Sequence, residues 1–228
     1  MPLYFQPTDT MTQRRNKTVA PPTTIRRLSI YFRVLGSLEA LGETSTSSGD
    51  LADQTGFTAA QVRRDLTYFG SFGKRGVGYD IAQLRQHLAS ILGVDQNWRM
   101  ALIGVGNLGR ALLSYGGFKN HGFNVVAAFD IRPELVGKTI SGITLRHTHD
   151  MYTLISGEQI DMVIVAVPAE NAQLVVNQVV DAGARAILNF SPTHIRVPQH
   201  VKLSHVDLAM EVEYLSYTIH GLKDTAPT

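Results

Sequence analysis

The stretch "RMALIGVGNLGRALL" (residues 99–113) decides the fold of this chain. It begins as an apolar run typical of a buried strand and continues with the spacing of a helix. Gly104, Gly106 and Gly109 lie between these two parts in a GxGxxG pattern, and Asp130 follows Gly109 by 21 residues at the end of the next apolar run. A strand, this glycine loop, a helix and a later acidic residue, in that order, predict a dinucleotide-binding site.

The same alternation continues along the second half of the chain. Further buried strands are expected over residues 124–130, 160–168 and 185–192, and helices over residues 107–119 and 169–182. Strands that alternate with helices of this length favour an α/β class with a Rossmann-like, doubly wound parallel sheet. We expect this domain to span residues 98–206.

Each part of the motif has a chemical role. The glycines permit a tight turn and close approach of the backbone to a pyrophosphate, which the following helix N-terminus attracts. Asp130 would accept hydrogen bonds from the adenosine ribose and repel a 2′-phosphate, which favours NAD over NADP. Arg132 leaves NADP open, because a nearby arginine can bind that phosphate. FAD, coenzyme A or a nucleotide-free fold with packing glycines are the alternatives.

Ligands in such sheets bind outside the carboxyl ends of the strands. From the sequence, the expected cofactor-binding residues are therefore Gly104, Val105, Gly106, Asn107, Leu108, Gly109, Asp130, Arg132, Val167, Pro168, Asn189 and Phe190.

The first half of the chain has a different pattern. Residues 1–24 are polar and rich in Pro and Thr, which indicates a disordered arm, and residues 25–41 have the apolar spacing of an amphipathic helix ended by Gly42. After a Thr/Ser-rich linker, two capping boxes, Ser47 with Asp50 and Thr58 with Gln61, open two short helices. The tight turn between them predicts a helix-turn-helix. A small hairpin formed by Val77 and Tyr79, the "wing", and a helix over residues 81–92 complete a winged-helix domain expected over residues 25–97.

The second of these short helices has two faces. Val62, Leu66 and Phe69 share one face, while polar side chains share the other, as expected of a recognition helix in a major groove. A second basic pair follows in a glycine-rich loop suited to phosphates or a minor groove. The expected DNA-binding residues are Ser48, Thr58, Gln61, Arg63, Arg64, Tyr68, Lys74 and Arg75.

Composition narrows the function. Residues 1–97 carry 11 Lys and Arg against 8 Asp and Glu, a small basic surplus on the side of the expected DNA-binding domain. The chain has no cysteine, no apolar run long enough to span a membrane and no signal-peptide pattern, so we expect a cytoplasmic protein without thiol chemistry.

No group of residues has a catalytic pattern. Lys202, His194 and His205 lie outside any recognisable motif, and His147 and His149 with Asp150 are typical of a polar turn and not of a metal site. We therefore expect no catalytic residue and no metal. A small NAD(P)-dependent reductase with an accessory helical domain, or a coenzyme A-binding module, is the alternative.

Taken together, "QVRRDLTYFGSFGKRGVGYD", "IGVGNLGRALLSYGGF" and "ILNFSP…VPQHVKLSHVDLAMEVEYLSY" resemble the Rex family of redox-sensing transcriptional repressors over about residues 25–220. The resemblance implies a non-enzymatic homodimer that binds palindromic operator DNA and is released when NADH binds, with NADH and NAD as sensed ligands. It implies that residues 207–221 form a dimerisation helix exchanged between subunits, followed by a tail at 222–228. Tyr115 and Leu208 would lie near the nicotinamide, and Arg33 and Asp207 would couple the domains.

Overall fold

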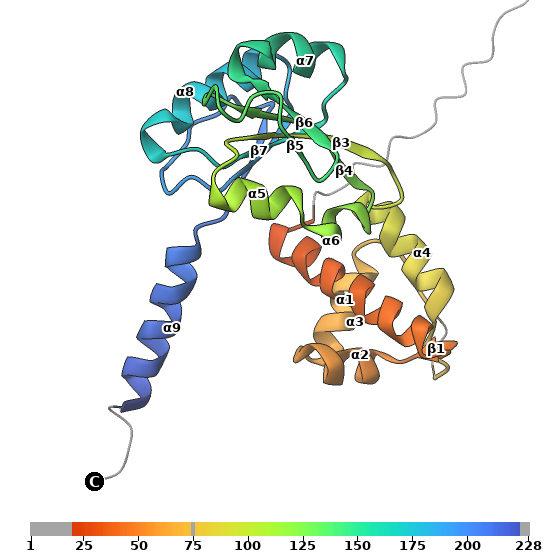
Figure 1. Ribbon diagram of the computed structural model, residues 1–228. Helices are drawn as coiled ribbons and strands as arrows, with labels where there is room; N and C mark the ends of the chain where they lie inside the picture. Colours follow the sequence, from red (N-terminus) through yellow and green to blue (C-terminus); the bar gives the residue numbers. More distant parts are fainter. Residues whose placement is uncertain (1–19, 74–75, 224–228) are drawn as a thin grey trace, which may run out of the picture. The chain divides into compact units, whose positions relative to one another are not determined.

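The computed structural model of the protein describes residues 20–73 and 76–223, and within 221–223 only the course of the helix (Figure 1). The chain forms two compact units, Met1–Gly93 and Val94–Thr228. The first contains the expected helix-turn-helix and the second the expected sheet.

The first unit opens with α1 (Pro22–Ala40). The helix starts three residues earlier than the sequence predicted, so the end of the expected arm is helical. Proline fits the first turn of a helix because its missing N–H has no partner there anyway. Thr24 is buried in that turn, and Gly42 with φ +84° follows the helix end.

The helix-turn-helix forms as predicted, from α2 (Ser48–Thr55) and α3 (Ala59–Thr67), with α4 (Ile81–Leu92) packed beside α1. Ser47 and Asp50 make the complete capping box. The second box is only half formed: the Thr58 hydroxyl accepts a hydrogen bond from the Gln61 backbone N–H, but the Gln61 side chain donates elsewhere.

The wing differs from the prediction of a local hairpin. The strand β2 (Tyr79–Asp80) pairs antiparallel with β1 (Ser45–Thr46), a segment expected to be part of a linker. Gly78 makes this pairing possible, because a Cβ there would lie 2.4 Å from the Thr46 carbonyl oxygen and its φ is +92°. The predicted DNA-binding residues Lys74 and Arg75 lie outside the described residues.

A buried carboxylate fixes α3 on α1. Asp65 is only 2% exposed and accepts hydrogen bonds from both Nε (2.6 Å) and Nη2 (2.8 Å) of Arg27, from the Tyr31 hydroxyl (3.0 Å) and from the Gln61 amide (2.9 Å). Burial alone would raise the pKa of Asp65, but the hydrogen bonds from Arg27, Gln61 and Tyr31 outweigh it and lower that pKa. The helix α3 is thus held on α1 by an ion pair as well as by apolar packing.

The second unit is built on a sheet with the strand order β5-β6-β4-β3-β7-β8-β9, in which every neighbouring pair is parallel except β5 with β6. Its strands are β3 (Trp98–Ile103), β4 (Phe123–Asp130), β5 (Thr139–Ile140), β6 (Ile143–His147), β7 (Met162–Val165), β8 (Ala186–Asn189) and β9 (Lys202–His205). The surrounding helices are α5 (Asn107–Leu113), α6 (Gly116–Lys119), η1 (Thr148–Asp150), α7 (Met151–Gly157) and α8 (Ala169–Asp181).

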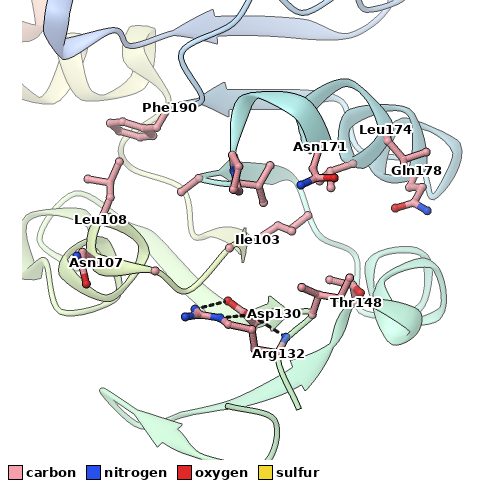
Figure 2. Close-up of a pocket in the computed structure, with 17 residues that line it drawn as sticks. Ile103, Asn107, Leu108, Asp130, Arg132, Thr148, Asn171, Leu174, Gln178 and Phe190 are labelled. Atoms are coloured by element: carbon pink, nitrogen blue, oxygen red, sulfur yellow. Dashed lines mark hydrogen bonds and ion pairs between the residues drawn. The ribbon is translucent and has the colours of Figure 1, made fainter. Parts of the chain in front are cut away.

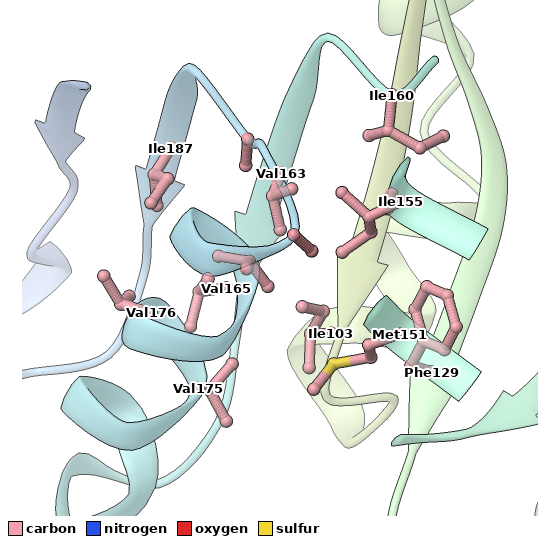
Figure 3. Packing of buried hydrophobic residues seen from close by; sticks show 14 of the residues in the cluster. Ile103, Phe129, Met151, Ile155, Ile160, Val163, Val165, Val175, Val176 and Ile187 are labelled. Carbon is pink, nitrogen blue, oxygen red and sulfur yellow. The ribbon is translucent and has the colours of Figure 1, made fainter. Parts of the chain in front are cut away.

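The side chains of the central strands alternate between two cores. Along β3, Ala101 and Ile103 pack in a cluster with residues of α7 and α8, which Figure 3 shows from close by. Met100 and Leu102 pack in a second cluster with residues of α5. Because successive residues of a strand face opposite sides, two cores mean that helices cover both faces of the sheet. The predicted doubly wound sheet is confirmed.

Several elements were not predicted. The expected helix over residues 107–119 is divided into α5 and α6 at Ser114 and Tyr115, just before Gly116 and Gly117. Glycine is a poor helix former, which accounts for a break at this place. The segment between β4 and β7, with β5, β6 and α7, and the strand β9 were also missed. All of these but α7 are strands of five residues or fewer, with weak periodic signals.

The last described helix is α9 (Leu208–Lys223), close to the predicted bounds. Its large apolar side chains are 55–80% exposed; they are Leu208, Met210, Val212, Tyr214, Leu215, Tyr217 and Ile219. Within the described ranges, no helix is long and apolar enough to cross a membrane.

The Asp65 network makes a prediction about stability. Asp65→Ala leaves Arg27, only 21% exposed, without its partner and should lower the free energy of unfolding of the first unit by about 3 kcal/mol. This free energy can be measured from the hydrogen-exchange rates of the α1 and α3 amides in the full chain. Because the folded-state pKa of Asp65 is lowered, the difference from wild type should be full above about pH 4 and shrink as the pH falls below it.

The matched control is Glu39→Ala, which breaks the Arg85–Glu39 ion pair of the same unit, where the side chains are 41% and 42% exposed. This pair should contribute less than about 1 kcal/mol. Equal losses in the two variants would contradict the role assigned to Asp65.

Candidate functional site

A cavity of about 690 Å³ opens in the second unit beyond the carboxyl ends of the central strands (Figure 2). It is lined by the loop after β3, the end of β4, the residues after β7 and one face of α8. This is the position at which open α/β sheets bind their ligands. The lining residues are Ile103, Gly104, Gly106, Asn107, Leu108, Asp130, Ile131, Arg132, Thr148, Ala166, Val167, Pro168, Asn171, Leu174, Val175, Gln178 and Phe190.

The three glycines of the motif lie in three different environments. Gly104 has φ +92°, and a Cβ there would lie 2.4 Å from the Ala166 carbonyl oxygen. A Cβ on Gly109 would lie 2.0 Å from the Gly104 carbonyl oxygen, so α5 could not approach β3. A Cβ on Gly106 would meet nothing within 4 Å, although Gly106 lines the cavity. Nothing in the chain itself requires glycine at Gly106, so the space beside this residue is open to a group bound in the cavity.

The chemistry around Gly106 suits a phosphate. Gly106 is the N-cap of α5, and no side chain caps this helix. The first backbone N–H groups of a helix have no acceptor within the helix and carry the positive end of its dipole. A pyrophosphate beside Gly106 would supply the missing acceptors.

Asp130 and Arg132 form the polar wall of the cavity. Asp130 is 5% exposed at the end of β4 and forms an ion pair with Arg132, with 2.9 Å between Oδ1 and Nε. Burial would raise the pKa of Asp130, but hydrogen bonds from the Arg132 side chain, the Arg132 backbone and the Val105 backbone hold it at about 2. Asp130 is therefore ionised throughout the physiological pH range.

The rest of the wall is mostly apolar. Leu108 and Phe190 lie on one side of the cavity in Figure 2, and Leu174 and Gln178 lie on the other. Pro168 and Val167 continue the apolar surface after β7. Apolar walls with a few placed polar groups are typical of pockets for flat aromatic ligands such as nucleotide bases. The cavity thus offers an anion site, a carboxylate and apolar surface, the parts that a dinucleotide needs.

Nine of the predicted cofactor-binding residues line this cavity: Gly104, Gly106, Asn107, Leu108, Asp130, Arg132, Val167, Pro168 and Phe190. Val105, within the glycine loop, and Gly109, in α5, are buried and do not line the cavity. Asn189 is also fully buried and bonds to Ser191 and His205. Tyr115 and Leu208 are 59% and 61% exposed and are not among the lining residues, so their expected place at the nicotinamide stays a prediction.

The sequence prediction missed the contribution of α8. Asn171, Leu174, Val175 and Gln178 follow one another at helical spacing and form the face of α8 that lines the cavity. That periodicity was visible in the sequence, but only the order of the strands tells which side of the sheet the helix covers. Ile131, which directly follows β4, and Thr148, at the start of η1 after β6, also line the cavity and were not predicted.

In the first unit, α3 presents an exposed polar face. Arg63, Arg64 and Tyr68 are exposed, and Arg63 donates a hydrogen bond to the Ser48 hydroxyl (2.8 Å) at the start of α2. In the described part of the unit, Arg64 forms no ion pair. Gln61 differs from the expectation of a free base-reading side chain, because its amide is bound to Asp65. Thr58 serves as the N-cap of α3.

The two residues expected to couple the domains occupy defined positions within their own units. Arg33 is exposed on α1. Asp207 precedes α9, and its carboxylate accepts a hydrogen bond from the Ala209 N–H (2.9 Å), as a helix cap does. Their coupling role stays a prediction.

The described residues contain no group of three His, Asp or Glu side chains that could hold a metal ion. His147 accepts a hydrogen bond from the His149 backbone N–H, which is the polar turn expected from the sequence. His205 is bound to Asn189 at the end of β9.

A helix-turn-helix with an exposed basic face, joined to a sheet with a dinucleotide-type cavity, defines a class of DNA-binding regulators that respond to a ligand. A known protein family matches each of the two parts of the chain. A family described as "Putative DNA-binding protein N-terminus" matches residues 20–67, and one described as "CoA binding domain" matches residues 95–193.

The relatives identify the family. The redox-sensing transcriptional repressor Rex of Desulfitobacterium hafniense is 41% identical over 87% of this chain and 95% of its own. Rex of Carboxydothermus hydrogenoformans is 43% identical, over 87% and 96%. This chain belongs to the Rex family of redox-sensing transcriptional repressors. The prediction of a non-enzymatic repressor is thereby confirmed over the alternatives of a reductase or a coenzyme A module.

Solved structures agree with this assignment. The Rex-family repressor RSP, crystallised with β-NAD⁺ and operator DNA, is 36% identical with a TM-score of 0.86, covering 92% of this chain and 100% of its own. RSP in complex with β-NADH is 35% identical with a TM-score of 0.82, covering 90% and 97%.

The glycine geometry makes a prediction that separates binding from folding. Gly106→Ala should melt like wild type, since its Cβ meets nothing, yet lose at least about tenfold in dinucleotide affinity because the methyl group occupies the phosphate site. Gly109→Ala is the matched comparison and should cost about 1–3 kcal/mol of stability, because backbone must move. Calorimetric titration and thermal melts measure both. A Gly106→Ala protein that binds as wild type does would contradict the assignment of the phosphate site.

Proposed function

We propose that this chain represses transcription by binding palindromic operator DNA as a homodimer and that NADH releases it. The observation that carries the proposal is the open space at Gly106 in a dinucleotide-type cavity, within a chain that also presents a basic recognition helix. The relative RSP, solved with operator DNA and NAD⁺ and with NADH, supports the same combination of ligands.

Within the cavity, the backbone around Gly106 would bind the pyrophosphate and Asp130 would bind the adenosine ribose. Leu108, Val167 and Phe190 would then surround the nicotinamide end. The distribution of polar and apolar residues in the cavity wall supports this arrangement. Tyr115 and Leu208 would complete the nicotinamide site in the dimer.

The nicotinamide end must distinguish the two redox states, because NADH and NAD differ only there. The oxidised ring carries a positive charge and the reduced ring is neutral. Moving a cation into an apolar enclosure costs desolvation free energy, so an apolar pocket prefers NADH. A ligand shifts a conformational equilibrium only by its difference in affinity for the two states, and DNA must weaken NADH binding by the same factor.

On the DNA side, Arg64 and Tyr68 are the exposed groups of α3 that would reach base edges, while Arg63 lies beside Ser48 and would contact phosphates. Lys74 and Arg75 would add phosphate or minor-groove contacts. The hydrogen bond between Gln61 and Asp65 favours a supporting role for Gln61 over base reading.

The exposed apolar residues of α9 support the proposed homodimer. A helix with so many large apolar side chains in water is typical of an interaction surface. We propose that α9 packs on a second copy of the chain, with exchange between subunits, and that Arg33 and Asp207 couple this arrangement to DNA binding.

Operator DNA and a dinucleotide pool occur together in the cytoplasm, where we place the protein.

The proposal predicts different responses to the two dinucleotides. In an operator gel shift, NADH should release the DNA, whereas NAD at the same concentration should leave the complex intact. Coenzyme A serves as the control for the family match over residues 95–193 and should have no effect. Release by NAD or by coenzyme A, and not by NADH, would contradict the proposal.

The recognition helix makes a second prediction. Arg64→Ala should weaken operator binding by about 1–3 kcal/mol and relax base preference, whereas Lys74→Ala should weaken binding to all sequences and lower the salt slope by about 1. Arg185→Ala is the charge-matched control, because Arg185 is exposed just before β8 in the second unit, and it should bind as wild type does. If Arg64→Ala and Arg185→Ala bind DNA alike, α3 is not the recognition helix.

A further inference from the structure

The carboxylate assigned to the ribose is already fully bonded. Oδ1 of Asp130 accepts from the Arg132 backbone N–H (2.9 Å) and from Arg132 Nε (2.9 Å). Oδ2 accepts from the Val105 N–H (2.7 Å) and from Arg132 Nη2 (3.0 Å). An ionised carboxylate has about four lone-pair positions, and these four donors fill them.

Arg132 also bridges two parts of the site. Its Nη2 donates to the Val105 carbonyl oxygen (3.0 Å) as well as to Asp130. The guanidinium therefore spans the end of β4 and the glycine loop, and it lines the cavity beside Asp130 (Figure 2).

The four donors are not equally mobile. The N–H groups of Val105 and Arg132 belong to the backbone, and the Asp130 carboxylate is buried. The Arg132 side chain is 44% exposed and can turn into solvent. A ribose diol can therefore bond to Asp130 only if the guanidinium leaves.

We propose that Arg132 is a selectivity residue that masks Asp130 and so reduces the preference of this site for NADH over NADPH. The inference rests on the proposed function, in which Asp130 faces the adenosine ribose. It has two consequences. NADH must displace the guanidinium, which weakens NADH binding. The 2′-phosphate of NADPH would face the Asp130–Arg132 ion pair, whose charges cancel, instead of a bare carboxylate, so the repulsion that excludes NADPH is removed. The guanidinium N–H groups that are not bonded to Asp130 could also donate to this phosphate.

The expected change in NADH affinity on removing Arg132 is opposite to that expected for a residue that only contacts the ligand. Removing a residue that lines a pocket normally weakens the ligand. Removing Arg132 frees two acceptor positions on Asp130 for the ribose and restores the negative charge there. Binding of NADH should strengthen while binding of NADPH should weaken.

The test is calorimetric titration of NADH, NAD and NADPH into wild type, Arg132→Ala and Arg132→Lys, with Arg185→Ala as the charge control. For Arg132→Ala we expect NADH and NAD to bind about fivefold more tightly, since the two guanidinium bonds to Asp130 no longer have to be exchanged for bonds to the ribose, and NADPH to bind about tenfold more weakly. NADH and NAD should shift by the same factor, because they share the adenosine ribose. Arg185→Ala should match wild type in all three titrations.

The Arg132→Lys variant distinguishes the masking of Asp130 by hydrogen bonds from the attraction of a positive charge for the dinucleotide. Lysine keeps the positive charge but cannot make the two parallel bonds to the carboxylate, so NADH should bind more tightly than in wild type here too. If Arg132→Ala weakens NADH and Arg132→Lys restores it, attraction for the pyrophosphate is the role of Arg132 and the inference is overturned. Unchanged NADPH binding in Arg132→Ala overturns it as well.

The titrations distinguish a failure of the proposed function from a failure of the inference about Arg132. Wild type that binds no NADH overturns the proposed function, and this inference with it. Wild type that binds NADH, with Arg132→Ala no tighter, overturns the inference alone. Thermal melts of each variant confirm that the titrated protein is folded.

Discussion

The cavity depends on one backbone contact, the approach of Gly109 in α5 to the carbonyl of Gly104 at the end of β3. A single methyl group at Gly109 would lie 2.0 Å from that oxygen. Because the contact holds the start of α5 against the strand end, the helix N-terminus points toward the cavity and Val105 reaches Asp130. The start of α5, where we propose that the phosphates bind, and the Asp130 carboxylate are thus placed by the same turn.

In the first unit, a buried carboxylate, Asp65, fixes the position of α3. Asp65 is buried among donors from α1 and α3, and its ion pair with Arg27 fixes the orientation of α3 on α1. A buried ion pair costs desolvation and contributes to stability only when its geometry is satisfied, as it is here. In each unit a buried carboxylate therefore holds an element of a proposed binding site: Asp65 holds α3, which we propose binds DNA, and Asp130 holds the loop that we propose binds the dinucleotide.

The sequence predicted what depends on local patterns: the glycine loop, the alternating strands and helices, the capping of α2 and the winged-helix order. It could not predict contacts between distant segments. The pairing of β2 with β1 depends on close approach at Gly78, and the bond from Gln61 to Asp65 depends on how α3 packs on α1. The pairing of Arg132 with Asp130 also needed coordinates, because a spacing of two residues at a strand end does not fix where a side chain points. Arg132 and Asp130 were both expected at the site, but not that Arg132 and the backbone would occupy all acceptor positions of the carboxylate.

The central claim is that a dinucleotide bound at the glycine loop controls DNA binding by the same chain. The most direct measurement is fluorescence anisotropy of an operator duplex titrated with NADH, in wild type and in Gly106→Ala. The account predicts equal operator affinity for the two proteins without NADH, and release by NADH from wild type only. Release from Gly106→Ala at the same NADH concentration would contradict it, because NADH would then act without the site described.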